Sequence, residues 1–165
     1  MREIARAGIM PDTYEEILYA GLYPRPYESP IQPSDFYSSY IQTYIERDLR
    51  LLKQVENLST FQAFMKMCAN RTGQILNFSS IANDCGITHN TAKKWLSLLE
   101  TSLIIILISP HHKNFNKHLV KTPKLYFTDP GLAAHLCGIQ KADDLRYHPI
   151  KGGLFETLIL SEFLK

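Results

Sequence analysis

The residue types best suited to chemistry gather in the middle of the chain, and the chemistry they suit is the binding of a polyanion. Residues 88–126 hold six lysines against the single acidic residue Glu100, a net charge of +5, whereas the whole 165-residue chain carries only +2. A concentrated basic region is the electrostatic footprint of a surface that binds nucleic acid. The alternative is an ordinary solvated face.

Eight residues of this region are candidate contacts with nucleic acid. Five would lie on the outer face of a helix and three in a following loop. They are His89, Asn90, Lys93, Lys94, Ser97, Lys113, Lys117 and Lys121. Lysine supplies positive charge to phosphates, and asparagine forms hydrogen bonds with base edges or with the backbone.

Motifs for other chemistries are missing from the sequence. His111, His112 and His118 lie close together, but no nearby cysteine or carboxylate completes a four-ligand zinc site, so solvated histidines are the better interpretation. GxSxG, HExxH, EF-hand and GxxxxGK[ST] patterns do not occur. We therefore expect no catalytic residue, no metal ligand and no cofactor in this chain.

Two short helices must position the candidate contacts. The apolar pattern predicts helices at 78–85 and 89–101, with Gly86 ending the first and Thr88 capping the second. The inner face of the second helix would be apolar, with Ala92, Trp95, Leu96 and Leu99. Two helices joined by a short glycine-containing turn are typical of a helix-turn-helix, whose second helix enters the DNA major groove.

A β-hairpin is predicted to follow these helices. The aliphatic run Leu103–Ile108 predicts a buried strand ended by Pro110, and Lys124–Phe127 predicts the returning strand. The loop between them carries the basic residues of the region. A helix-turn-helix followed by a hairpin with a basic tip is a winged helix, predicted here for residues 59–128.

The first 58 residues are predicted to form a helical segment with a proline-rich connector. Asp12 would cap a short helix that Gly21 ends. Four of the nine prolines fall between residues 22 and 33, which predicts an irregular, stiff connector. Ser34 would then cap a longer helix with a tyrosine- and isoleucine-rich core face.

Residues 129–165 are predicted to be C-terminal helices of a larger α/β region. Asp129 and Pro130 open one helix, and Gly153–Leu164 forms another that is apolar nearly all round. Such a helix belongs inside a layered structure, and the chain ends before any layer that would cover it. Glu156 lies within the apolar run, where a carboxylate is costly unless it is paired or bound to metal.

Composition places the chain among ordinary globular proteins, and the predicted fold class is mainly α with a small β-hairpin. Apolar residues make up 45% and charged residues 21%, so collagen-like and disordered classes are excluded. No apolar run approaches the length of a membrane helix, and we expect no membrane partner. Cys68, Cys85 and Cys137 show no CxxC spacing, which predicts reduced thiols and a cytoplasmic location.

Five sequence motifs occur in a fixed order along the chain. They are GLYP (21–24), YIQTYIERDL (40–49), NRTGQILNFSSIANDCGI (70–87), NKHLVKTPKLYFTDPGLAAHLCGI (116–139) and GLFETLILSEFLK (153–165). Together they resemble the C-terminal region of a bacterial and archaeal family of AAA-type ATPases, a region known chiefly as a domain of unknown function.

This resemblance implies an ATPase module, then a winged helix, then the start of a PD-(D/E)xK nuclease-like region. ATP and Mg²⁺ would belong to the ATPase module, which this chain lacks. In nuclease-like members the glutamate that matches Glu156 could be a metal ligand, but its partner residues would lie beyond Lys165, so we expect no catalytic role for Glu156. His118 departs from the family pattern, which usually has arginine there.

Two functions follow as hypotheses. The first is a non-catalytic DNA-binding winged-helix module of an AAA-type ATPase, with double-stranded DNA as its partner. The alternative is a protein-interaction or oligomerisation module that couples the ATPase to partners, in which the chain associates with itself through its apolar C-terminal helix.

Overall fold

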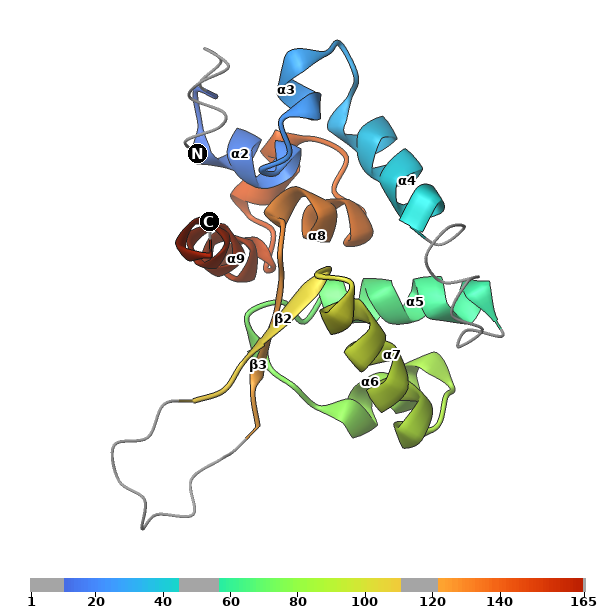
Figure 1. Ribbon diagram of the computed structural model, residues 1–165. Helices are drawn as coiled ribbons and strands as arrows, with labels where there is room; N and C mark the ends of the chain where they lie inside the picture. Colours follow the sequence, from blue (N-terminus) through green and yellow to red (C-terminus); the bar gives the residue numbers. More distant parts are fainter. Residues whose placement is uncertain (1–10, 45–56, 111–121, 165) are drawn as a thin grey trace.

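The computed structural model describes residues 11–44, 57–110 and 122–164 (Figure 1). It confirms the predicted fold class, mainly α with a small β-hairpin, and adds a third short strand to the hairpin. The elements, in chain order, are α2 (Tyr14–Ala20), α3 (Arg25–Glu28), α4 (Pro33–Tyr44), α5 (Leu58–Ala69), β1 (Gln74–Ile75), α6 (Phe78–Cys85), α7 (His89–Thr101), β2 (Ile105–Ile108), β3 (Lys124–Phe127), α8 (Pro130–Leu136), the 3₁₀ helix η2 (Ala142–Arg146) and α9 (Lys151–Phe163).

Helices α2, α3, α4, α8 and α9 lie together on one side of the molecule, and α5, α6 and α7 lie on the other (Figure 1). The hairpin of β2 and β3 begins between the two groups, where β2 contacts α7 and β3 contacts α5, α8 and α9, and its far end projects away from them. One continuous cluster of buried side chains runs through the two groups, from Ile17 in α2 to Leu158 in α9. Within the described part of the chain, no helix is long and apolar enough to cross a membrane.

The N-terminal helix α2 begins one residue later than predicted. Thr13, not Asp12, is its N-cap, and the Thr13 hydroxyl accepts a 3.3 Å hydrogen bond from the Glu16 backbone N–H. The Asp12 backbone N–H donates instead to the Glu16 carboxylate, at 2.8 Å. Gly21 ends the helix as predicted, with a φ of 77° that favours glycine.

The proline-rich segment is not wholly irregular, because it contains the short helix α3. Pro24 caps α3 and Pro26 lies in its first turn, where the backbone N–H that proline lacks has no intrahelical partner. Helix α4 then begins at Pro33 rather than after a Ser34 cap, and the Asp35 and Phe36 N–H groups donate to the Gln32 carbonyl.

Helices α6 and α7 have the predicted bounds, and the turn between them has the predicted chemistry. Gly86 adopts the left-handed conformation (φ 65°, ψ 31°) that ends α6. The Thr88 hydroxyl accepts a 3.1 Å hydrogen bond from the Thr91 backbone N–H and so caps α7.

The sheet is antiparallel with the strand order β1–β3–β2. Strand β2 begins at Ile105, two residues later than predicted, because Leu103 has a φ of 57° and is 72% exposed in the turn after α7. Strand β1 was not predicted. It has only two residues, and its pairing with β3 rather than any alternation of its own makes it a strand.

Helix α9 buries one face only within the described chain, and the prediction that it belongs inside the layered structure of a larger region stays a prediction. Leu154, Thr157, Leu158 and Ser161 form the buried face. Both hydroxyl groups of this face form hydrogen bonds. The Thr157 hydroxyl lies 2.9 Å from the Thr72 hydroxyl, and the Ser161 hydroxyl donates a 2.8 Å hydrogen bond to the Thr128 carbonyl. Phe155, Ile159 and Phe163 stay exposed on the other face.

Candidate nucleic-acid interface

The exposed face of α7 carries the five helical residues predicted to contact nucleic acid. Ala92, Trp95, Leu96 and Leu99 are buried, as the apolar period predicts. The opposite face is exposed and carries His89, Asn90, Lys93, Lys94 and Ser97, with Glu100 and Thr101 toward its C-terminal end. The structure therefore brings the five predicted side chains together on one surface.

Trp95 fixes α7 against α5. Its ring makes edge contacts with Phe61 and Phe64, with centroids 5.2 Å and 5.4 Å apart. Trp95 and both phenylalanines are buried, so these contacts hold the helix from its inner side. The outer face is thus presented by a helix whose orientation is set by aromatic packing.

Phe78, at the start of α6, is a member of this surface that the sequence analysis did not identify. The Lys93 ammonium lies 5.8 Å from the centroid of the Phe78 ring, and the His89 ring lies 5.6 Å from it. A cation over an aromatic face is weakly attracted to it. Phe78 therefore restrains two of the candidate contacts, an arrangement that only the packing of α6 on α7 creates.

The charges near the start of α7 are positive. Its first turn has no acidic residue, while Lys93 and Lys94 follow within the next turn. Asp84 of α6 is paired with Arg71, which offsets its charge. The acidic residue of α7 itself, Glu100, lies near the other end of the helix.

The remaining predicted contacts, Lys113, Lys117 and Lys121, lie outside the described residues, as do His111, His112 and His118. Strands β2 and β3 flank that segment. Among the residues the structure does describe, no cluster of three or more His, Cys, Asp or Glu side chains could hold a metal ion.

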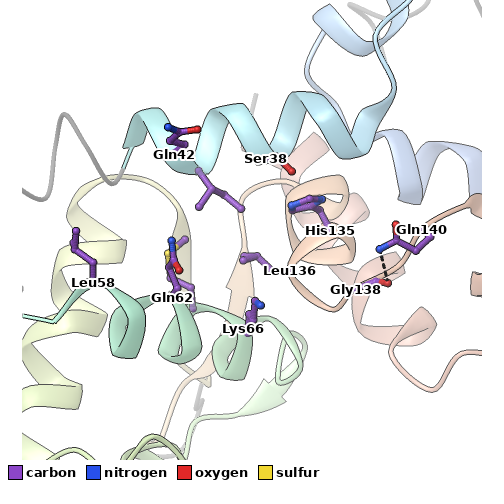
Figure 2. Close-up of a pocket in the computed structure, with 11 residues that line it drawn as sticks. Ser38, Gln42, Leu58, Gln62, Lys66, His135, Leu136, Gly138 and Gln140 are labelled. Carbon is purple, nitrogen blue, oxygen red and sulfur yellow. Dashed lines mark hydrogen bonds between the residues drawn. The ribbon is translucent and has the colours of Figure 1, made fainter.

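A second candidate site is an open pocket of about 620 Å³ lined by α4, α5, α8 and the segment that follows α8 (Figure 2). Its apolar lining is Ile41, Leu58, Met65 and Leu136. Its polar side chains are Ser38, Gln42, Gln62, Lys66, His135 and Gln140. Among these lining residues none is acidic. Because three separate segments build the walls, no local motif could have revealed the pocket.

His135 and Lys66 are the ionisable groups of this pocket. Lys66 comes from α5 and His135 from α8, on facing walls (Figure 2). Burial lowers the pKa of His135, and the nearby Lys66 charge lowers it further. The His135 ring also packs against Tyr37, with centroids 6.1 Å apart.

Glu156 has apolar neighbours in sequence, but its side chain is not buried among them and it is paired, which is one of the conditions given above for a carboxylate at this position. Its side chain is 50% exposed and accepts hydrogen bonds from the Tyr126 hydroxyl (2.7 Å) and the Lys124 ammonium (3.2 Å). The Tyr126 hydrogen bond and the Lys124 charge lower the pKa of Glu156. Helical geometry explains the difference, because Glu156 projects toward β3 rather than into the core.

Comparison with known protein families decides the affiliation of the chain. The family described as "Domain of unknown function (DUF8612)" matches residues 11–143. The chain belongs to this family. The DUF8612 match includes α2 to α8 with the sheet, and α9 follows it.

Two longer mycobacterial proteins are similar to this DUF8612 chain. They are Uncharacterized protein Mb2031c of Mycobacterium bovis and Uncharacterized protein Rv2008c of Mycobacterium tuberculosis, each 29% identical over 123 residues. The aligned region is 74% of this chain but 28% of each relative, so the chain spans little more than a quarter of their length. No solved structure matches the chain.

Proposed function

We propose that this chain is a DNA-binding winged-helix module, with α7 as the helix that enters the major groove. The observation that carries the proposal is the exposed polar and basic face of α7, which follows a short capped turn after α6. At 13 residues α7 is about 20 Å long, and an α-helix about 10–12 Å in diameter fits into a major groove about 12 Å wide.

Each part of the proposed surface has its own role. Lys93 and Lys94 contact phosphates, while His89, Asn90 and Ser97 offer hydrogen bonds to base edges or backbone. Strands β2 and β3 form the stem of the wing, and Lys113, Lys117 and Lys121 between them contact neighbouring phosphates. In this proposal β1 completes the small sheet by pairing with β3.

The parent of the module, in this proposal, is an AAA-type ATPase. The five ordered motifs in the sequence support it, as does the greater length of the mycobacterial relatives. ATP and Mg²⁺ are held by the ATPase module, and the winged-helix module has no catalytic role in this proposal. The proposed location is the cytoplasm, which the free thiols of Cys68, Cys85 and Cys137 support. Coding DNA beside this segment should encode GxxxxGK[ST] upstream; an uninterrupted frame without it would contradict the ATPase assignment.

The DNA-binding proposal is tested by fluorescence anisotropy with a random-sequence duplex at several salt concentrations. We expect binding at low salt that weakens steeply as salt rises, because counterions are released from DNA. The slope of the logarithm of the association constant against the logarithm of the salt concentration is negative. In the double variant Lys93→Ala/Lys94→Ala its magnitude should decrease by about 2. Lys141→Ala/Arg146→Ala removes the same charge from η2 and its cap, and should leave the slope unchanged. Absence of binding at low salt would refute the proposal.

A second candidate function is self-association through α9. Phe155, Ile159 and Phe163 are 46%, 44% and 84% exposed, and they border a shallow groove of about 330 Å³ that Ile108 and Tyr126 of the hairpin complete. A continuous exposed apolar patch is typical of an interaction surface.

Substitutions test this second candidate better than deletion of α9, because Leu154 and Thr157 of α9 are fully buried in the core. Ile159→Ser/Phe163→Ser should convert an associated form to the monomer in light scattering. Tyr147→Ser, at an aromatic residue that is 97% exposed on another element, is the control. A wild-type protein that is monomeric at high concentration would exclude self-association.

A further inference from the structure

The pocket between α4, α5 and α8 combines an apolar lining with a lysine that has no carboxylate partner among the described residues. Its volume of about 620 Å³ lies within the range of small-molecule sites. Lys66 makes no ion pair with any carboxylate of the described chain, and none of the described lining residues is acidic. The exposed face of α7 is a separate surface, so the pocket needs an explanation independent of DNA binding.

We propose that this pocket binds a small organic anion, whose apolar body packs on Ile41, Met65 and Leu136 and whose carboxylate, sulfonate or phosphate group is held by Lys66 and His135. Lysine and a protonated histidine are both donors to such a group, and charge-assisted hydrogen bonds are the stronger ones. Gln62, from the turn of α5 before Lys66, supplies a further amide donor at the same wall (Figure 2).

His135 makes the binding dependent on pH. The charged and titratable groups that face it are Lys66 from α5 and the phenol of Tyr37 from α4; the other α4 residues of the lining, Ser38, Ile41 and Gln42, do not titrate. Without an anion, Lys66 and burial keep His135 neutral near pH 7. An anion between the two groups favours the protonated imidazole, so binding should take up a proton and strengthen as the pH falls.

The probe for this site is 1-anilinonaphthalene-8-sulfonate, an aromatic sulfonate, titrated into the full chain at pH 6 and pH 8 and followed by fluorescence. We expect one saturable phase that is tighter at pH 6 and is displaced by inorganic phosphate. Lys66→Met should weaken this phase about tenfold, because a charge-assisted hydrogen bond is lost. Ser38→Trp, which fills the pocket from the exposed side of α4, should abolish it.

Matched variants separate the pocket from other surfaces. Lys141→Met removes a lysine outside the pocket, and Ile159→Ser alters the exposed apolar face of α9, which also attracts the probe. Neither should change the saturable phase. Circular dichroism shows whether Ser38→Trp folds. If it does not, Gln62→Trp is a second variant that fills the pocket. An affinity that is unchanged in Lys66→Met and in the filling variants, or lost in Ile159→Ser, would overturn the proposal.

Discussion

Tyr37 and Asp129, 92 positions apart in the chain, are joined by a buried hydrogen bond of 2.7 Å between the phenol oxygen and Oδ1. The same phenol lies 2.9 Å from the Ala20 carbonyl, so one proton faces two acceptors. Asp129 also accepts from the backbone N–H groups of Leu22 (2.7 Å) and Leu132 (2.8 Å). This fully buried carboxyl group therefore ties the end of α2 and the middle of α4 to the start of α8.

If Asp129 carries a proton, every hydrogen-bonding group at this junction has a partner, because the carboxyl group donates to the Tyr37 hydroxyl and that hydroxyl donates to the Ala20 carbonyl. Burial raises the pKa of Asp129, which agrees with that arrangement. A carboxyl group whose pKa is higher in the folded state contributes stability that is complete below its unfolded pKa, near 4. That contribution is lost as the pH rises toward the folded pKa.

Asp129→Asn tests the protonation of this carboxyl group, because asparagine keeps the shape and cannot ionise. The free energy of unfolding of the wild type, minus that of the variant, should fall as the pH rises above about 4, by up to about 1.4 kcal/mol per pH unit. Urea unfolding at pH 4, 5, 6 and 7 measures this difference, and other titrating groups cancel between the two proteins. A difference that stays flat or grows as the pH rises from 4 to 7 would mean that Asp129 is ionised in the folded protein.

Replacing each of two adjacent glycines at the start of α9 by alanine should have different effects on the stability of the protein. A Cβ on Gly153 would lie 2.3 Å from the Thr72 carbonyl oxygen, whereas a Cβ on Gly152 would meet nothing within 4 Å. Gly153→Ala should therefore destabilise the protein by about 2 kcal/mol or more, because backbone must move. Gly152→Ala should be neutral or stabilise it by up to about 1 kcal/mol through helix propensity. Thermal unfolding of the two variants gives the comparison, and equal effects would contradict the close packing of α9 on Thr72.

The features that sequence analysis predicted correctly depend on local signals. Helices α6 and α7 have the predicted bounds because Gly86 and Thr88 are strong stop and start signals within three residues of each other. The outer face of α7 follows from the helical period alone. The helical period does not indicate that Thr157 and Ser161 of α9 are buried, because both are polar, and only their hydrogen bonds across the core make their burial favourable.

The features that sequence analysis missed depend on contacts between distant segments. Strand β1 exists through its pairing with β3, some 50 residues away along the chain. Lys66 and His135 face one pocket only because α5 and α8 are brought together. Several of the motifs that carry the family resemblance also contact one another in the packed interior rather than at a binding or catalytic site. Gly21 lies against Asp129 and Gly153 lies against Thr72. Such motifs preserve a fold and do not by themselves identify an activity.

Tyr126→Phe should raise the pKa of Glu156 toward its usual value. The Tyr126 hydrogen bond is the leading cause of the lowered pKa, with Lys124 the second, so the variant removes the first and keeps the charge. A titration of the Glu156 side-chain carboxyl carbon by NMR reports it directly. Tyr147→Phe is the matched control, at a phenol that is 97% exposed. An unchanged Glu156 pKa in Tyr126→Phe would assign the shift to Lys124 alone.

Phe78→Leu should separate positioning from charge on the proposed DNA surface. The Phe78 ring lies beside both Lys93 and His89, and leucine keeps an apolar contact while removing the aromatic face. We expect DNA affinity to fall about two- to fivefold, the range of an exposed cation–π contact, with the salt slope unchanged because every charge remains. Lys93→Ala, in contrast, should decrease the magnitude of the salt slope by about 1. Anisotropy titrations at four salt concentrations distinguish the two effects. A salt slope that changes in Phe78→Leu would mean that the ring is needed for the lysines to contact phosphates, and does more than orient their side chains.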